Sequence, residues 1–148
     1  MSEIEIREIK DTEMNECLNL VWKTFLEFEA PDYTQEGIEE FKKSIFDNEW
    51  IRQRRFIGAF ENNSLIGMIA TKNGNHIALF FVDGKYHKRG IGRKLYQYAV
   101  KQNNTGYFTV NSSPYAHEVY KHLGFEDTDE KQSVNGLIFY PMKNDKIN

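Results

Sequence analysis

Cysteine is almost absent from this 148-residue sequence, and its scarcity excludes two ways of stabilising a small protein. The single thiol, Cys17, cannot form an intramolecular disulfide or a multi-cysteine zinc site. Its place on the apolar side of the first expected helix is typical of a core thiol. A chain of this length buries about two-thirds of its unfolded surface, so a hydrophobic core alone is sufficient. We therefore expect one domain over residues 1–148.

Long hydrophobic runs and a basic surplus are also missing. No stretch approaches the roughly 20 apolar residues of a membrane span, and the opening MSEIEIREIK is charged throughout, unlike a signal peptide. A net charge of −3 and a pI near 5.8 argue against general nucleic-acid binding, which favours a basic surface. We expect a cytoplasmic protein with neither nucleic acid nor membrane as a partner.

The charges that are present are distributed unevenly. Residues 85–94 carry five Lys or Arg side chains and one His without any acid, whereas residues 27–49 carry eight acids against two lysines. Such runs usually form solvated faces. Their meaning depends on the elements around them.

The first third of the sequence predicts a strand followed by two helices. Alternation of apolar and polar residues at 4–9 indicates a half-buried strand. Two runs of apolar residues at helical spacing follow, the first capped by Asp11 and the second by Thr34. The tripeptide Ala30-Pro31-Asp32 separates the two helices.

Two asparagine-containing turns then predict an antiparallel meander. The turns lie at residues 62–63 and at Asn73-Gly74, because asparagine and glycine tolerate the left-handed conformations of tight hairpins. The strands that they connect are expected at 55–60, 65–71 and 76–82. The last of these is nearly all apolar, which predicts a central strand covered on both faces.

The rest of the chain predicts a crossover and a closing pair of strands. A helix should follow the basic loop and lead to a short strand at 107–110. Ser113-Pro114 is typical of a helix start, and Gly124 suits the end of that helix. Further strands are expected around Phe125 and at 137–142. The fold class is α/β (α+β), with a mixed central sheet of about six or seven strands flanked by four helices.

The basic loop between the apolar strand and the next helix is the most informative segment. Gly90 and Gly92 lie where that helix begins, and a helix N-terminus offers unpaired N–H groups and the positive end of a dipole. Glycine lets a phosphate approach the backbone closely, so the loop is suited to a pyrophosphate. The alternative is a tight turn with a solvated basic face. Arg93 and Leu95 exclude the P-loop and dinucleotide-binding patterns.

Two segments resemble motifs of the GNAT superfamily of N-acetyltransferases. The stretch FFVDGKYHKRGIGRKLYQYAV is similar to motif A, whose pattern [Gln/Arg]-x-x-Gly-x-[Gly/Ala] opens the central helix. His87 replaces Gln or Arg at the first position, so a weaker side-chain contact with intact binding is expected. The segment 111–125 is similar to motif B, with Tyr120, Gly124 and Phe125 at its Tyr-x-x-x-Gly-Phe end. The order of expected elements also matches this family along nearly the whole chain.

The resemblance implies that two strands splay apart around acetyl-CoA, without a metal. The pyrophosphate would lie on the loop made by His87, Lys88, Arg89, Gly90, Ile91, Gly92 and Arg93. Backbone groups near Phe81 and Val82 would hold the pantetheine and polarise the thioester carbonyl, and Asn111 would hydrogen-bond the cofactor or the acceptor. Tyr120 matches the family tyrosine that protonates the CoA sulfur, although a core tyrosine is the alternative.

The resemblance places the acceptor near the break between the first two helices. Glu27, Glu29 and Tyr33 lie there and are the candidate substrate-binding residues. The general base stays open between Glu27, Glu29 and a water relay, because the strand at 76–82 offers only His76. Acids at the helix break predict a cationic acceptor, whereas those on the second helix, Glu36, Glu39 and Glu40, are expected to solvate it.

The expected activity is transfer of an acetyl group from acetyl-CoA to a primary amine of a small molecule. The alternative is a non-catalytic acyl-CoA-binding sensor that keeps the loop but releases no thiol. A homodimer is left open, and the acceptor's identity is not encoded in a motif.

Overall fold

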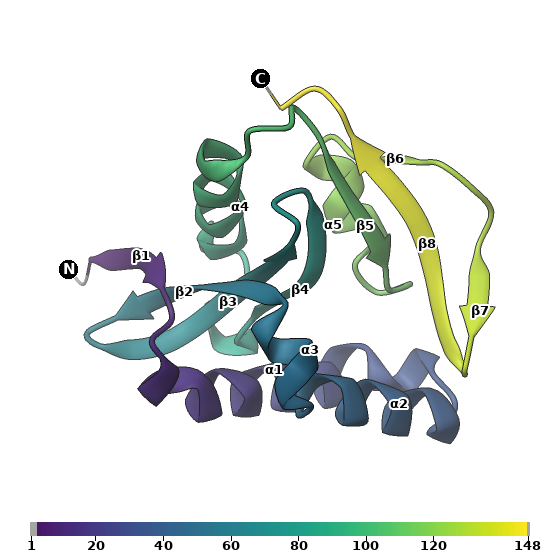
Figure 1. The fold of residues 1–148 in the computed structure, drawn as a ribbon, viewed down its shortest axis with the longest axis horizontal. Helices are drawn as coiled ribbons and strands as arrows, with labels where there is room; N and C mark the ends of the chain where they lie inside the picture. Colours follow the sequence, from purple (N-terminus) through teal and green to yellow (C-terminus); the bar gives the residue numbers. More distant parts are fainter. Residues whose placement is uncertain (1–2, 148) are drawn as a thin grey trace.

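The computed structural model, which describes residues 3–147, is a mixed sheet with helices on both faces (Figure 1). The sheet has the order β1-β2-β3-β4-β5-β8-β6, and β7 pairs with β8 beside this path. Its strands are β1 (Ile4–Glu8), β2 (Arg54–Glu61), β3 (Ser64–Lys72), β4 (His76–Val82), β5 (Phe108–Ser112), β6 (Glu126–Asp127), β7 (Gln132–Val134) and β8 (Leu137–Asn144). The α-helices are α1 (Met14–Phe28), α2 (Gln35–Ile45), α3 (Asn48–Arg52), α4 (Ile91–Gln102) and α5 (His117–His122). Among the described strands the β4–β5 pair is parallel and the other pairs are antiparallel, so the predicted mixed α+β fold is confirmed.

Consecutive left-handed residues form the hairpin turns. Between β2 and β3, Asn62 and Asn63 have φ angles of 51° and 67°, as the sequence predicted. Asn73 and Gly74 form the second predicted turn, with φ angles of 57° and 76°. A third such turn, at Asn135-Gly136 between β7 and β8, was not predicted, although Asn-Gly is a strong hairpin signal.

Two hydrophobic clusters form because neighbouring residues of a strand point to opposite faces. The cluster under α1 and α2 includes Cys17, which is fully buried, so its predicted core position is confirmed. The other cluster includes Leu95 and Tyr96 of α4. The Tyr96 ring packs against Phe108 and Phe125, with centroid distances of 5.8 Å to each, and so connects α4 to the second half of the sheet.

The sheet opens between β4 and β5. Only two residue pairs join these parallel strands, His76 with Thr109 and Ile77 with Val110. A register shift in the β3–β4 pairing falls at Ala78, just beyond the last of these pairs. From Ala78 onward β4 has no partner strand on this side within residues 3–147, and the gap provides the space for a ligand site.

Several element predictions were wrong in detail. The described chain has five α-helices and eight strands, because the short α3 and β7 were not predicted. Asp11 does not cap α1; it opens a short 3-10 helix, where the Glu13 side chain accepts a hydrogen bond of 2.9 Å from the Lys10 N–H. The hydroxyl of Ser113 does accept from the Ala116 N–H at 3.2 Å, but the helix itself begins at His117.

The prediction that β4 is covered on both faces is confirmed, although the cover is incomplete on one of them. Helix α1 contacts β4 from one face and α4 from the other. Ile77, Leu79 and Phe81 are buried, whereas the residues between them are only half-buried. No helix within residues 3–147 has the length and apolar character needed to cross a bilayer.

The tip of the β7–β8 hairpin lies against the start of α2 (Figure 1). A Cβ built on Gly37 of α2 would overlap the carbonyl oxygen of Gly136, and one on Gly136 would overlap Gly37 and Thr34. The predicted cap is confirmed at this point, since the Thr34 hydroxyl accepts from the Gly37 N–H at 3.2 Å. Two glycines therefore allow the hairpin backbone to pack directly on the helix.

Replacing Gly37 with alanine should push the backbone of the β7–β8 hairpin away from α2. Alanine is the better helix former by about 1 kcal/mol, yet the overlap should outweigh that gain and destabilise the fold by about 1–3 kcal/mol. Each kcal/mol corresponds to a fall of roughly 2–4 °C in melting temperature for a chain of this size. Lys43→Ala, on an exposed position of the same helix, is the matched control. A melting temperature for Gly37→Ala at or above that of the wild type would contradict the prediction.

Candidate functional site

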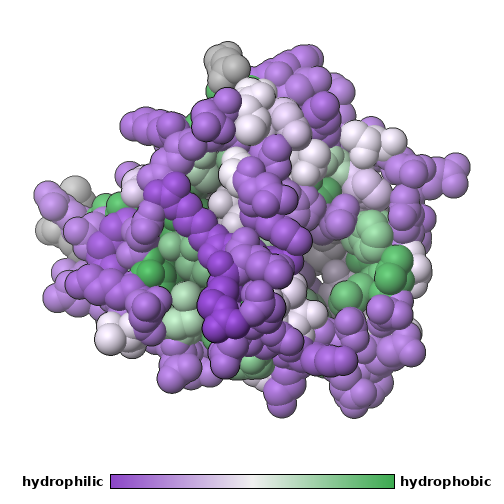
Figure 2. Space-filling view, viewed as in Figure 1, coloured by the Kyte–Doolittle hydropathy of each residue, from purple (hydrophilic) through white to green (hydrophobic). Residues whose placement is uncertain are grey.

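Two cavities, each of about 350 Å³, lie at the gap between β4 and β5. We call the first the loop cavity; the loop before α4 lines it together with Phe28, Tyr115 and Val119. We call the second the hairpin cavity; α2 and the β7–β8 hairpin line it. Figure 2 shows the surface hollowed above α2, beside a hydrophobic patch over the hairpin. The residues that line both cavities, and so mark their junction, are Glu29, Phe80, Phe81, Ala116 and Tyr120.

The loop before α4 has the backbone geometry of an anion-binding site. Gly90 is the N-cap and has a φ of 79°, and Lys88 has a φ of 65°. The first helical hydrogen bond is donated by the Lys94 N–H to the Gly90 carbonyl at 3.1 Å. The N–H groups of the preceding helical residues therefore lack helical acceptors. A Cβ on Gly90 would meet no atom within 4 Å, so the loop backbone borders open space that a phosphate fits.

The basic side chains of the loop divide into two groups. The Arg89 guanidinium donates to Glu61 at 3.1 Å and lies over the Tyr86 ring, so it is held within the protein. Lys88 lines the loop cavity, and within residues 3–147 neither Lys88 nor Arg93 is paired with a carboxylate. The predicted cofactor residues that line the loop cavity are Phe81, Val82, His87, Lys88, Gly90, Ile91 and Gly92.

His87 has an intramolecular partner at the position where the motif has Gln or Arg. Its Nε2–H donates to the Val82 carbonyl at 2.8 Å, because a carbonyl can only accept. The ring also packs on Phe28, at a centroid distance of 4.7 Å. The imidazole thus fixes the end of β4 against α1 and forms a wall of the loop cavity.

The backbone of β4 presents unpaired polar groups to the gap. Hydrogen-bonded and non-hydrogen-bonded pairs alternate along an antiparallel ladder, and the Asp83 N–H donates to Ile66 of β3 at 2.9 Å. Counting back from this bond, Phe81 is paired with β3, while the polar groups of Val82 and Phe80 point toward the gap. Since His87 occupies the Val82 carbonyl, the N–H groups of Val82 and Phe80 are the donors that face a ligand.

Tyr120 lies at the junction of the two cavities, and its hydroxyl is available to a ligand. Its ring is buried against Phe80 and Phe125, at centroid distances of 6.0 Å and 5.3 Å. Burial raises its pKa, and the nearby Glu29 adds to the shift, so the phenol keeps its proton at neutral pH. Within the described chain its hydroxyl has no hydrogen-bond partner, whereas the Tyr96 hydroxyl accepts from the Asn144 amide at 2.9 Å.

Glu29 faces the same junction from the end of α1. Burial raises its pKa to about 7, a hydrogen bond from Ser113 opposes the shift, and the charge of Asp32 adds to it. A carboxyl with this pKa exchanges protons near neutrality. Glu27, two residues earlier, is exposed and lines neither cavity.

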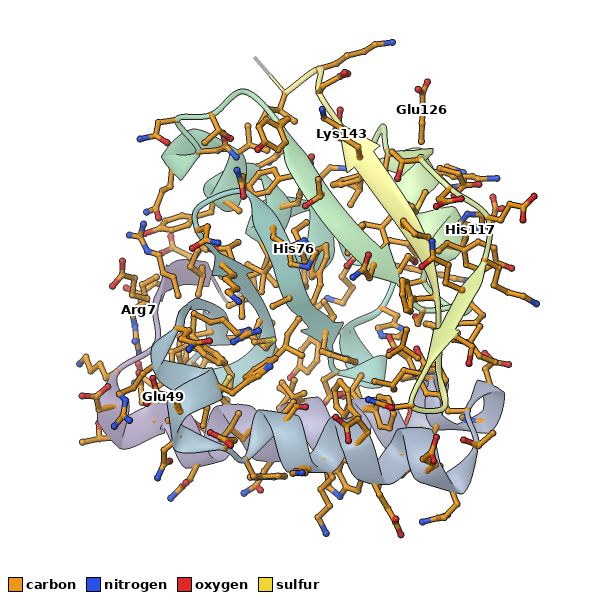
Figure 3. The ribbon with its side chains drawn as sticks, turned by 45° about the vertical axis from the view of Figure 1, so that its right-hand side comes forward. Arg7, Glu49, His76, His117, Glu126 and Lys143 are labelled. Carbon is orange, nitrogen blue, oxygen red and sulfur yellow. The ribbon has the colours of Figure 1, made fainter. Side chains whose placement is uncertain are left out.

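The other predicted residues separate between the two cavities. Tyr33 lines the hairpin cavity, where its ring stacks on Phe25 at 5.6 Å. Asn111, on β5, also lines the hairpin cavity and not the loop cavity. Figure 3 shows His76 at the paired end of β4, where its Nδ1 contacts the Thr109 hydroxyl at 2.8 Å, outside both cavities.

Sequence reasoning missed residues whose exposure depends on the gap. Val119, which sequence reasoning did not place in a site, is 51% exposed and lines the loop cavity. Glu40 was expected to solvate α2, yet it is half-buried and lines the hairpin cavity. Among residues 3–147, no group of three or more His, Cys, Asp or Glu side chains is arranged to hold a metal ion.

Comparison with known proteins relates this geometry to one family. A family model described as an acetyltransferase (GNAT) domain matches residues 29–146. No curated protein sequence matches the chain significantly.

Solved structures share the fold. A GCN5-related N-acetyltransferase from Rhodopseudomonas palustris is 20% identical, with 97% of this chain and 96% of that chain covered and a TM-score of 0.83. The PaiA N-acetyltransferase from Thermoplasma acidophilum, in complex with coenzyme A, is 20% identical over 96% and 98% of the two chains, with a TM-score of 0.75. An aminoglycoside 6'-N-acetyltransferase complexed with coenzyme A is 13% identical over 95% and 96%, with a TM-score of 0.63.

The match covers more than half of the sequence and includes both the loop before α4 and the Tyr120 region. The splayed strands and the anion-binding loop agree with it. This chain belongs to the GNAT acetyltransferase family.

Proposed function

We propose that this chain transfers an acetyl group from acetyl-CoA to a primary amine of a small molecule. One observation carries the proposal: a carboxyl group, of Glu29, and a phenol, of Tyr120, line the junction of two cavities, and the loop before α4 lines one of them. Two similar structures, from T. acidophilum and of the aminoglycoside N-acetyltransferase, contain coenzyme A. A cytoplasmic location and a homodimer remain predictions.

The loop cavity is the proposed site of acetyl-CoA. Its diphosphate would bind the N–H groups that open α4, supported by the unpaired cations Lys88 and Arg93. The gap-facing N–H groups of Val82 and Phe80 would bind the pantetheine and the thioester carbonyl. Because His87 already donates to β4, we assign it a positioning role and not a phosphate contact.

Starting from an ammonium group, the reaction removes two protons from the nitrogen and supplies one to the sulfur. Acetyl-CoA supplies an activated acetyl carbon, to which the amine nitrogen bonds as the carbon–sulfur bond breaks. Glu29 accepts the proton that the ammonium group loses before attack, directly or through water. Tyr120 donates its phenolic proton toward the leaving sulfur, and the resulting phenolate takes the second proton from the nitrogen. Both residues line the junction, so these transfers occur beside the same carbon.

Replacing Glu29 with glutamine should remove the acidic limb of the pH–rate profile. With a pKa of about 7, the carboxyl is an effective base only above that pH, so wild-type kcat/KM should fall as the pH drops below 7. The variant should lose at least about tenfold in kcat/KM at pH 8 and show a flatter profile. The measurement is steady-state kinetics from about pH 5.5 to about pH 9, a range that brackets this pKa.

The Glu29→Gln substitution should also change how the stability of the fold depends on pH. A carboxyl whose pKa is raised on folding destabilises the native state as pH rises from its ordinary value of 4.5 toward about 7. The Glu29→Gln variant should therefore lose less stability than the wild type over this range. Glu27→Gln, at the exposed neighbour, is the matched control and should leave both profiles unchanged. An equal loss of activity in both variants would show a general charge effect instead of a base at residue 29.

The activity itself is tested by thiol release from acetyl-CoA in the presence of an amine panel. An acetyltransferase releases one thiol for each amine acetylated. The alternative, an acyl-CoA-binding sensor, would bind CoA in calorimetry but release no thiol with any amine. That result would overturn the enzymatic proposal while leaving the assignment of the loop intact.

A further inference from the structure

The walls of the hairpin cavity have a distinctive composition. Its only charged side chains among the described residues are two carboxylates, Glu29 and Glu40, and it has no Lys, Arg or His in its lining. Its aromatic side chains are Tyr33, Phe41, Phe80, Phe81, Tyr120 and Phe139. A cavity of this kind favours a cation with an apolar body and disfavours an anion.

We propose that the acceptor is a monoamine: one primary ammonium group on a small aromatic or branched aliphatic body, without a carboxylate. This inference rests on the proposed acetyl transfer, since it assigns the hairpin cavity to the acceptor. It narrows the broad class of cationic amines to arylalkylamines and their aliphatic counterparts.

The arrangement of polar and apolar walls orients such a molecule. Glu29 and Tyr120 form the polar end at the junction with the loop cavity, and Ser113 also lines the hairpin cavity. Beyond them, the walls come from Phe41 of α2 and from the hairpin, including Phe139. The amine therefore points to the junction, and the apolar body lies between α2 and the hairpin.

The size of the cavity limits the body of the acceptor. Its volume of about 350 Å³ is near the lower end of the roughly 300–1,000 Å³ that is usual for ligand sites. The hairpin cannot readily move closer or slide, because the Gly136 backbone already contacts Gly37. A single ring or short branched chain on a short linker fits this space better than a polycyclic amino sugar.

The second carboxylate explains why an amino acid should be rejected. Glu40 lies three residues after Gly37, on the turn of α2 that follows the hairpin contact, and is half-buried. A carboxylate carried by the acceptor would lie in a small cavity whose only charges are negative. Repulsion of this kind excludes a competitor without any contact specific to the preferred substrate.

The composition of the walls also decides against polyamines. A polyamine would place its further ammonium groups among six aromatic side chains, with Glu40 as the one remaining carboxylate of the described lining. An amino sugar would likewise place hydroxyl groups against these rings, with Ser44, Asn111, Ser113 and Asn135 as the uncharged polar side chains of the described lining, apart from the tyrosines. An arylalkylamine leaves no such polar group buried, because its only polar atom is the reacting nitrogen.

The experiment compares matched acceptors by thiol release from acetyl-CoA. Phenethylamine, L-phenylalaninamide and L-phenylalanine share a ring and differ in the substituent beside the amine; putrescine and glucosamine lack the apolar body. We expect kcat/KM for phenethylamine to exceed that for putrescine, glucosamine and phenylalanine by at least about tenfold. Phenylalaninamide should fall closer to phenethylamine than to phenylalanine, which would assign the rejection to charge and not to bulk.

Two variants test whether the hairpin cavity determines this selectivity among acceptors. Phe139→Ala should raise KM for phenethylamine several-fold and leave KM for acetyl-CoA unchanged. Glu40→Gln should reduce the discrimination against phenylalanine, and raised salt should reduce it in the wild type. Arg52→Ala, on the exposed surface of α3, is a control expected to change none of these values.

The outcomes separate the two proposals. Thiol release with putrescine or glucosamine as the best acceptor, or with phenylalanine equal to phenethylamine, would overturn this inference and leave acetyl transfer standing. Bound CoA without thiol release from any of the five amines would overturn the proposed function and this inference with it.

Discussion

The Gly90→Asp variant should bind CoA at least tenfold more weakly than the wild type, a loss of about 1.4 kcal/mol or more. Gly90 is the N-cap of α4 and has a φ of 79°, and a side chain at this position would project where no atom lies within 4 Å. A carboxylate there would face the diphosphate that we assign to the free N–H groups of the loop. The added charge would repel the ligand, and the left-handed φ would add strain.

Gly90→Asn is the matched control for that result. Asparagine has nearly the size and shape of aspartate and tolerates a left-handed φ, so the two variants differ mainly by one charge. Calorimetric titration with CoA should rank affinity as wild type, then Gly90→Asn, then Gly90→Asp, while both variants keep the wild-type circular dichroism spectrum. If a folded Gly90→Asp protein bound CoA with the same affinity as the wild type, the assignment of the diphosphate to this loop would be wrong.

Tyr120→Phe should lower kcat by about 10²–10⁴-fold, the range typical of a lost general acid. The substitution keeps the ring and its packing against Phe80 and Phe125, so it removes only the hydroxyl. Because that hydroxyl has no hydrogen-bond partner within the described residues, the melting temperature and the affinity for CoA should change little. Single-turnover kinetics, in which chemistry limits the rate, give the measurement.

Tyr96→Phe provides the opposite pattern as a control. Tyr96 is also buried in the same hydrophobic cluster, but its hydroxyl accepts a hydrogen bond from Asn144. Removing it leaves the Asn144 amide one partner short and should cost about 1–3 kcal/mol of stability with kcat unchanged. If Tyr120→Phe behaves like Tyr96→Phe, Tyr120 is a core residue and another group protonates the sulfur.

The fold could be predicted to within a few residues because its signals are local. Hairpin turns at Asn62 and Asn73, the cap at Thr34 and the apolar run of β4 each specify their own element. Short elements were missed for the same reason. α3 has one turn and β7 has three residues, and such lengths carry too few side chains to show a period.

The candidate site could be predicted only in part, because a cavity wall depends on which elements meet. Sequence spacing treats Glu36, Glu39 and Glu40 alike, but the contact of Gly37 with the hairpin brings only Glu40 to the cavity. The bond from His87 to the Val82 carbonyl depends on the turn between them, which no pattern encodes. The residues of the loop before α4 could be predicted because the spacing of its glycines and its charges can be read directly from the sequence.

The narrow attachment between the two halves of the sheet has a thermodynamic consequence. Two backbone pairs join β5 to β4, and the remaining attachments of the segment β5–β8 are side-chain packing, including the rings of Tyr96 and Tyr120, and the glycine contact at α2. Because so few backbone pairs cross this opening, which we call the seam, the segment is a candidate for a separate cooperative unit that opens at a lower free energy than global unfolding.

Both cavities have walls on each side of this seam, so neither exists while the unit is detached. A ligand that bridges the seam binds only the closed form and stabilises it by mass action. Binding and the closing of the seam are therefore one linked equilibrium: substitutions at the glycine contact, remote from the reacting atoms, would weaken every ligand by the same factor.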